Sequence, residues 1–404
     1  MAWKKDIFNN FIKLNRGFDL PEKDIVFGEF PVVASTSIKA YHHTYKVEPP
    51  CVVTGRSGSL GAVQYITLRC WPLNTTLYVK DCKENLPRYV YYFLETMHLE
   101  NFNSGAGVPT LNQNHLHKLK INIPPLPIQK KIAAVLSAYD DLIENNNRRI
   151  SILEKMAEEL YREWFVRLRF PGHEKIKIVK GVPEGLEVVS AGKYFKLVKG
   201  RSYSSEEIAD YDATENHRFF ITLKNFKRGG GFRQDAKKYY CGKYNENQVV
   251  TGGSLVIAVT DMTQDRAVIG RIARIPFGMP ESIISCDVVK IEPLNISDSF
   301  LYALLRFSSY SESLKEFANG ANVLHLKPEL ASIQKIIVPP KPLRDSFDDK
   351  FRPLIKSMDS INNTLELLAT SRDRLLSRLM SGKIDVENMD IEFPASMQEE
   401  VVHA

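Results

Sequence analysis

The sequence predicts an α+β protein in which two mixed α/β domains are separated by two long helices that form an antiparallel coiled coil. Two observations lead to this fold class. Aligned without a gap at an offset of 215, segments 105–127 and 320–342 are identical at nine of 23 positions. Each segment then leads into a long stretch with apolar residues at heptad spacing, which is typical of a coiled-coil helix. A repeat of this kind indicates a duplicated unit.

The repeat divides the chain into alternating domains and helices. We expect a first domain, a spacer helix, a second domain, a second spacer helix and an acidic tail, over residues 1–124, 125–170, 171–338, 339–383 and 384–404. A further similarity, between 11–17 and 194–200, has an offset of 183, so the second domain carries about 32 extra residues. Runs of β-branched and aromatic residues broken by Gly, Asn and Pro predict short strands and turns in both domains.

Composition narrows the class of protein. A chain of 404 residues is too long for one core. No apolar run approaches the ~20 residues of a membrane helix, the N-terminus lacks the apolar segment of a signal peptide, and the five cysteines show no CxxC spacing. We therefore expect a cytoplasmic protein. Its net charge of +6 becomes +12 when the acidic tail is left out, a moderate bias toward polyanions such as nucleic acid.

Both helical segments follow a Pro-Pro pair and keep one apolar seam. The first seam comprises Ile132, Leu136, Tyr139, Ile143, Ile150, Leu153 and Leu160, and the second comprises Phe347, Phe351, Leu354, Met358, Ile361, Leu365, Leu368, Leu375 and Leu379. Antiparallel pairing places the polar exception Arg372 near Tyr139, where a cation–π contact can form. Two unrelated amphipathic helices on separate cores are the alternative. Pro353 predicts a kink or the true start of the second helix.

Candidate DNA-binding residues gather in a basic, glycine-containing segment of each domain. Segment 218–243 holds eight basic residues, one acid and six aromatic residues around three consecutive glycines. Such a loop can hold phosphates and reach bases, or it can be a solvated hairpin with core aromatics. The candidates are Lys224, Asn225, Lys227, Arg228, Arg233 and Lys237 in the second domain, and Lys39, His42, His43, Arg56 and Ser57 in the first. The His42–His43 pair also fits a surface turn.

Motifs for catalysis are missing from the sequence. The glycine-rich loop at 55–61 lacks the Gly-Lys-Ser/Thr of a phosphate-binding loop. No Pro-Pro pair stands in the Asp/Asn-Pro-Pro-aromatic motif of DNA amino-methyltransferases. The histidines do not cluster with cysteines or acids at metal-ligand spacing. We therefore expect neither a catalytic site nor a metal site.

The chain resembles the specificity subunit of a type I restriction-modification enzyme. The resemblance rests on the stretch PPLPIQKKIA at 124–133 with the helix behind it, on its weaker copy after 339, and on the FxKLxxG-like start of each half. It implies a non-catalytic subunit that binds double-stranded DNA. Each domain would then be a target recognition domain for one half of a bipartite, asymmetric site.

The same resemblance implies the partners of the chain. The coiled coil would set the gap between the half-sites and dock modification (methyltransferase) subunits, two of them by expectation. Restriction subunits, which cleave DNA and translocate with ATP, would join that complex. S-adenosylmethionine, ATP and Mg²⁺ would be bound by these partners and no cofactor by this chain. A protein-binding coiled-coil scaffold without DNA specificity is the alternative function, and a steep salt dependence of DNA binding would separate the two.

Overall fold

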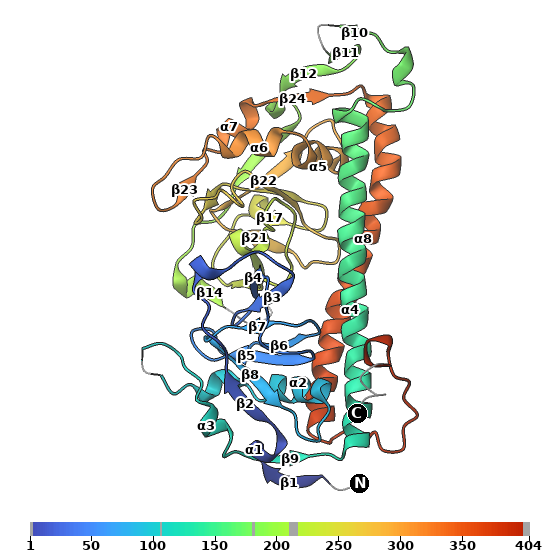
Figure 1. Cartoon of the computed structure of the whole chain (residues 1–404). Coiled ribbons are helices and arrows are strands. Elements are labelled where there is room, and N and C mark those ends of the chain that lie inside the picture. The colour runs from blue at the N-terminus through green and yellow to red at the C-terminus, as the bar shows by residue number, and fades with distance from the viewer. Residues whose placement is uncertain (1–2, 106, 180–181, 210–216, 399–404) are drawn as a thin grey trace. The chain divides into compact units, whose positions relative to one another are not determined.

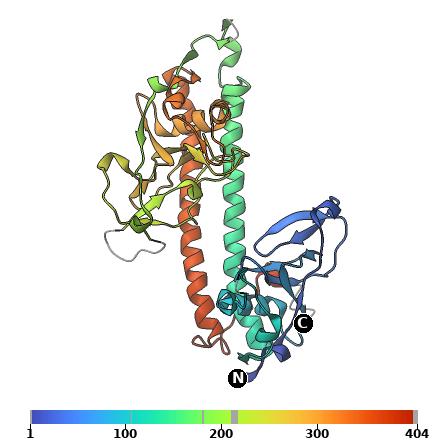
Figure 2. The same ribbon diagram turned by 90° about the vertical axis from the view of Figure 1, so that its left-hand side faces the viewer.

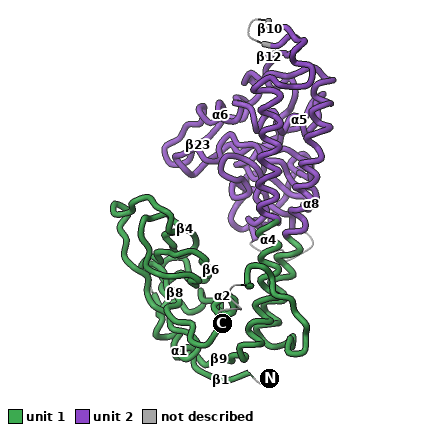
Figure 3. The backbone as a smooth tube through the Cα atoms, turned by 45° about the vertical axis from the view of Figure 1, so that its right-hand side comes forward, with its two compact units in different colours: residues 1–145, 366–404 green, residues 146–365 purple. Residues whose placement is uncertain are grey.

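The chain divides into two compact units, which Figure 3 distinguishes by colour. Unit 1 contains residues 1–145 and 366–404, and unit 2 contains residues 146–365. The computed structural model describes residues 3–105, 107–179, 182–209 and 217–398. Glu399 and Glu400 of the expected acidic tail lie outside these residues. Both long helices contribute one end to each unit.

The duplication read from the sequence is present in the backbone. In unit 1, strands β1 (Lys4–Ile7) and β9 (Lys120–Ile123) form an antiparallel pair. In unit 2, β12 (Glu187–Ser190) and β24 (Lys335–Val338) form the same pair. Register is also shared, because Lys4 lies opposite Ile123 as Glu187 lies opposite Val338. The two pairs are related by the offsets of 183 and 215 found in the sequence.

Each unit contains a four-stranded sheet with the same strand order, β2-β8-β5-β6 in unit 1 and β13-β22-β18-β20 in unit 2. In unit 1 the strands are Lys13–Arg16, Thr76–Asp81, Cys51–Gly55 and Val63–Ile66. In unit 2 they are Phe195–Lys199, Val288–Pro293, Leu255–Ala258 and Ile272–Arg274. An amphipathic helix packs on each sheet, α2 (Pro87–Thr96) on β5 and β6 and α5 (Asp298–Phe307) on β20.

A second sheet differs between the units. In unit 1 it has the order β4-β3-β7, with strands Ile38–His42, Phe30–Val33 and Trp71–Pro72. In unit 2 it has the order β14-β16-β15-β21-β17, with strands Ile208–Ala209, Tyr239–Tyr240, Arg218–Ile221, Ser282–Ile284 and Val249–Val250. The additional residues of the second copy thus build a wider sheet around the basic segment.

Smaller elements complete the described part of the chain. Unit 1 also has the short helices α1 (Phe8–Phe11) and α3 (Gln113–Leu116). Unit 2 also has α6 (Tyr310–Lys315), α7 (Glu329–Ile333) and the strand pairs β10–β11 (Ile178–Val179, Val182–Pro183) and β19–β23 (Thr260–Asp261, Leu324–His325). Within those residues no helix is both long and apolar enough to span a membrane.

The two long helices are α4 (Leu126–Tyr161) and α8 (Lys341–Met380). They begin 215 residues apart, directly after the Pro-Pro pair of each repeat. A π-helical turn, Arg162–Val166, extends α4. Helix α8 runs through the exposed Pro353, so Pro353 does not mark its start. In each unit the segments of α4 and α8 lie side by side (Figures 1 and 2).

The predicted seams are buried or half-buried at every position. None of their 16 residues is exposed. In unit 1, Ile132, Leu136 and Leu379 are buried in one core with residues of α2. In unit 2, Phe347 packs its ring 5.7 Å from that of Trp164 and 6.1 Å from that of Tyr161. The seams therefore contribute to the domain cores as well as to contacts between helices.

Candidate nucleic-acid interface

The basic segment of unit 2 is a loop held closed by a buried asparagine. Asn225 ends a 3-10 turn, Leu223–Asn225, and its side chain is fully buried. Its amide nitrogen donates to the carbonyls of Arg233 (3.1 Å) and Ala236 (2.8 Å), and its oxygen accepts from the backbone N–H of Thr222 (3.0 Å). We expected Asn225 among the DNA contacts, but all these bonds are internal. Its role in the structure is to shape the loop, because a buried amide must satisfy its own hydrogen bonds.

The three glycines form the tip of this loop. Gly229, Gly230 and Gly231 all have positive φ, between 80° and 106°, which residues with a Cβ rarely adopt. The backbone N–H of Gly231 donates to the carbonyl of Ile272 (2.9 Å), and a Cβ at Gly231 would lie 3.0 Å from the guanidinium of Arg306. The tip is therefore fastened to the four-stranded sheet and closely packed on one arginine.

The charged side chains of the loop face outward, but three of them have acidic partners in unit 2. Lys227 is 2.9 Å from Glu154, Arg228 is 3.2 Å from Asp265, and Arg233 is 2.5 Å from Asp235. The hydrogen bond from Arg233 lowers the pKa of the Asp235 carboxyl. Lys224 and Lys237 are exposed. Exposed ion pairs are weak, so these arginines can exchange a carboxylate for a phosphate or a guanine edge.

The aromatic residues of segment 218–243 lie mainly in the core. Phe219 and Phe226 belong to the apolar core between the sheets, and Phe220 stacks on Tyr240 with ring centroids 5.0 Å apart. Phe232 and Tyr239 are half-buried against the same core. The aromatic residues thus fit the solvated-hairpin alternative, whereas the exposed cations fit the phosphate-binding one.

A cleft of about 240 Å³ opens beside Lys224. Tyr203, Thr222, Met262 and Asp287 line it, together with Lys238. The side chain of Met262 is 76% exposed and that of Tyr203 is 41% exposed, so both are accessible to a ligand. Tyr203 and Met262 could not be found from the sequence, because a single exposed apolar residue leaves no local sequence pattern.

In unit 1 the two neighbouring histidines have different environments. His42 is 3% exposed; its Nδ1 accepts from the backbone N–H of Val26 (3.1 Å) and its ring lies edge-on to Trp71. His43 is exposed, and Lys39 on β4 pairs with Glu22 at 2.5 Å. Our expectation that His42 contacts DNA therefore needs correction, because its ring is packed inside the fold. His43 and Lys39 remain accessible.

Arg56 and Ser57 lie directly after β5, and Arg56 lines a cleft of about 280 Å³. Arg56 lines this cleft with Arg16, Asn112, Gln113 and Asn114, and no acidic residue is among the described residues that line it. Asn112 caps α3 by accepting from the N–H of Asn114 (2.9 Å). Two guanidinium groups beside neutral amides suit an anionic ligand with acceptor atoms, such as a DNA backbone. Arg16 and Gln113 were missed because they are distant from Arg56 in sequence.

Among the residues that the structure describes, no three His, Cys, Asp or Glu side chains gather to hold a metal ion. All five cysteines are free. Each unit presents cations and neutral polar side chains at its cleft, Arg16, Arg56 and Gln113 in unit 1 and Lys224, Lys238 and Thr222 in unit 2. These are the groups that bind phosphates and base edges.

Comparison with known proteins connects this architecture to a family. Residues 5–155 match the model of the type I restriction modification DNA specificity domain. The type I restriction enzyme MjaIX specificity subunit of Methanocaldococcus jannaschii is 27% identical, over 90% of this chain and 88% of its own. The MjaVIII specificity subunit of the same organism is 23% identical, over 79% of this chain and 75% of its own.

A solved structure shares the fold. The crystal structure of the type I restriction-modification system S subunit from M. genitalium has a TM-score of 0.58 to this chain. The alignment covers 94% of this chain and 96% of that one, at 18% sequence identity. This likeness shows a shared fold over most of both chains.

Proposed function

We propose that this chain, which is similar to type I restriction enzyme specificity subunits, is the sequence-specific DNA-binding subunit of such a complex. Each unit contributes one target recognition domain, and each domain reads one half of a bipartite, asymmetric site in double-stranded DNA. The chain itself carries out no catalysis. The observation that supports this proposal is the duplicated fold, in which both copies have the same sheet order and the same strand register.

The proposed contact residues are the accessible members of the two basic groups. In unit 2 they are Lys224, Lys227, Arg228, Arg233 and Lys237, to which the cleft adds Tyr203 and Met262. In unit 1 they are Lys39, His43, Arg56 and Ser57, to which the second cleft adds Arg16 and Gln113. Their positively charged groups neutralise phosphates, which supplies affinity without sequence information, and bidentate groups such as guanidinium distinguish bases.

The long helices are proposed to act as a spacer. They form an antiparallel coiled coil that sets the gap between the two half-sites and docks two methyltransferase subunits. Support comes from the seam residues, all of which are buried or half-buried. Restriction subunits join the same complex, and S-adenosylmethionine, ATP and Mg²⁺ belong to these partners.

The test is a map of methylated adenines. The chain is produced with its methyltransferase partner in cells, and modified positions are compared with and without this chain. We expect one two-part motif with a fixed gap, present only with the chain. Methyl transfer by the purified single chain would contradict the non-catalytic assignment. Methylation that is independent of the chain would contradict DNA specificity.

A protein-binding scaffold is the second candidate. It is favoured by the acidic partners of Lys227, Arg228 and Arg233, which neutralise part of the basic loop. The two functions differ in their response to salt. A DNA-binding chain that releases about six counterions loses roughly a thousandfold in affinity between 50 and 200 mM salt. A weak and salt-insensitive association with DNA would favour the scaffold.

A further inference from the structure

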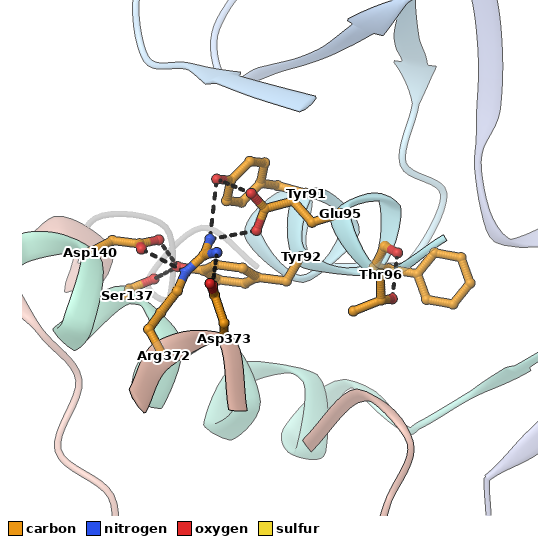
Figure 4. A network of polar contacts seen from close by, with 9 residues as sticks. Tyr91, Tyr92, Glu95, Thr96, Ser137, Asp140, Arg372 and Asp373 are labelled. Atoms are coloured by element: carbon orange, nitrogen blue, oxygen red, sulfur yellow. Dashed lines mark hydrogen bonds and ion pairs between the residues drawn. The ribbon is translucent and has the colours of Figure 1, made fainter. Parts of the chain in front are cut away.

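Arg372 of α8 is the centre of a nearly buried polar network in unit 1 (Figure 4). Only 13% of its side chain is exposed. Its guanidinium lies 2.5 Å from Glu95 of α2 and 3.1 Å from Asp140 of α4. It also lies over the ring of Tyr92, 5.7 Å from the ring centroid. The ring expected beside Arg372 was Tyr139, but the side chain turns toward α2 instead.

The two carboxylates have further partners. Tyr91 donates its hydroxyl hydrogen to Glu95 (2.9 Å), and Tyr92 donates to Asp140 (2.6 Å). Ser137 lies 3.1 Å from the Tyr92 hydroxyl. Because α2 belongs to the first recognition domain, the network joins that domain to both long helices. It does so within unit 1, through bonds whose distances and directions are fixed.

The directional hydrogen bonds of this network can restrict rotation of the domain, which the surrounding apolar core cannot do. The apolar core beside this network tolerates small rotations, because hydrophobic burial depends on area and not on direction. The Arg372 guanidinium contacts Asp373 as well, at 3.1 Å, and a guanidinium held by several carboxylates tolerates little rotation, since its N–H groups lie in one plane. Burying charges also costs free energy. A network of this kind is therefore better suited to fixing an orientation than to adding stability.

Unit 2 has a corresponding attachment with the signs reversed. Arg274 on β20 makes two hydrogen bonds to Asp359 on α8, of 3.0 and 2.8 Å, and both side chains are over 90% buried. Helix α8 thus presents an acid to the second domain and an arginine to the first. Each domain carries the matching charge.

We propose that Arg372 is a positioning residue that, through Glu95, fixes the angle at which the first recognition domain is held on the long helices. This inference rests on the proposed function: the angle determines which gap between half-sites the assembled complex accepts. It further implies a rule for exchanging recognition domains. A first domain functions on this α8 only if it presents an acid where Glu95 stands.

The first experiment measures the angle itself. Spin labels are placed at Lys39 in the domain and Asn145 on α4, after Cys241 and Cys286 are replaced by Ser in the full-length chain. We expect one narrow distance distribution for the parent chain and a broader or shifted one for Arg372→Met. The control is Arg374→Met on the exposed side of the same helix, which should behave as the parent. An unchanged distribution in Arg372→Met overturns the proposal.

The second experiment measures the consequence for DNA. In the complex with the methyltransferase, binding is compared for duplexes with the native gap and with gaps one base pair longer or shorter. We expect Arg372→Met to lose on the order of tenfold in discrimination between gaps, the value of one misplaced base contact. Arg372→Lys, which keeps the charge, should recover part of it. If Arg372→Met does not fold, Glu95→Gln and Arg372→Lys decide the outcome in both experiments, and unchanged behaviour in both overturns the proposal.

The two experiments distinguish failure of the proposed function from failure of the positioning role of Arg372. A parent chain that accepts every gap equally contradicts the proposed function, while the distance measurement still tests the role of Arg372. A parent chain that selects one gap, with an Arg372→Met chain that selects the same gap equally well, contradicts the positioning role alone.

Discussion

The two units attach their mixed α/β domains to the long helices with opposite charge. In unit 1 the arginine is on α8 and the acids are Glu95 and Asp140. In unit 2 the arginine is in the domain, and the acid is Asp359 on α8. At the offset of 215, Arg372 corresponds to the buried Ala157 and Asp359 to the exposed Glu144. The duplication has therefore kept the backbone frame and not the charges that dock it.

This difference shows where a duplicated protein can diverge. Strand register is tightly constrained, because a slip by one residue turns every buried side chain outward. Docking charges are less constrained, because either sign satisfies a buried pair if the partner matches. We therefore expect that the two mixed α/β domains cannot be exchanged between the units, because each would meet a charge of its own sign on α8.

The largest effect should follow from breaking the pair in unit 2. Arg274→Met leaves Asp359 buried without its partner and should cost about 3–5 kcal/mol of unfolding free energy. Replacing Arg274 by Met and Asp359 by Leu in the same chain should restore most of the lost unfolding free energy. With Trp3 and Trp71 changed to Phe, the fluorescence of Trp164 reports on unit 2 during urea unfolding. The exposed pair of Lys341 and Asp345 is the control, where Lys341→Ala should change stability by less than about 1 kcal/mol.

The stability of the double variant shows whether the Arg274–Asp359 pair contributes net stability. If the double variant is as unstable as the single one, the pair contributes net stability, and the view that it mainly fixes orientation is wrong for unit 2.

The next prediction concerns the long helices α4 and α8 and tests whether they act as a spacer. Seven residues are inserted in each helix, after Asn147 in α4 and after Leu365 in α8, which keeps the heptad phase. The insertion lengthens the pair by about 10.5 Å, or roughly three base pairs at ~3.4 Å each. The methylated motif should keep both half-sites and gain about three base pairs in its gap. An insertion in α4 alone should abolish methylation, and an unchanged gap would rule out the spacer.

Several features of this fold could be read from the sequence because they leave a pattern. The repeat offsets 183 and 215 identify the equivalent strand pairs, and the heptad spacing identifies both helices. The Pro-Pro pair marks where α4 and α8 begin. Of the two outcomes predicted for Pro353, a start of the helix at this residue is excluded, because α8 begins at Lys341 and runs through it.

The site was harder to predict, because it depends on contacts between distant segments. His42 and Asn225 have the right chemistry for DNA contacts, yet both are buried. Arg372 was recognised as the polar exception in a seam, but its partner Glu95 is 277 residues away in sequence. Local patterns predict which residues are polar or apolar. They do not predict which of the polar ones remain accessible after folding.

A smaller effect compares base reading by the two units. Arg228→Ala in unit 2 and Arg56→Ala in unit 1 should each cost about 1–3 kcal/mol of binding free energy if the side chain reads a guanine. Each should relax one position in its own half-site only. Lys237→Ala is the control for a phosphate contact, which should weaken all sequences alike and reduce the salt slope by about one. Relaxed specificity in both half-sites after one substitution would contradict the proposal that each unit reads its own half-site.

If DNA affinity is unchanged when Arg228, Arg233 and Lys237 are replaced together, the loop is a solvated hairpin.

The smallest effect concerns pH and the network of unit 1. Burial raises the pKa of Glu95 above its ordinary value of 4.5, against the attraction of Arg372, while Asp140 adds to the rise and Tyr91 opposes it through its hydrogen bond. A carboxyl whose pKa is higher in the folded than in the unfolded chain binds its proton more tightly when folded. Its contribution to stability is therefore full below pH 4.5 and is lost as pH rises through the folded pKa.

The comparison that isolates this contribution is between the parent chain and Glu95→Gln, whose amide does not titrate. The difference in unfolding free energy, parent minus variant, should fall as pH is raised from about 4 toward 7. One proton limits the slope to about 1.4 kcal/mol per pH unit. Unfolding is followed by the fluorescence of Trp3 and Trp71 in a Trp164→Phe background, so that the signal comes from unit 1. A difference that rises with pH would mean that Arg372 outweighs burial at Glu95, and the network would then stabilise the unit as well as orient it.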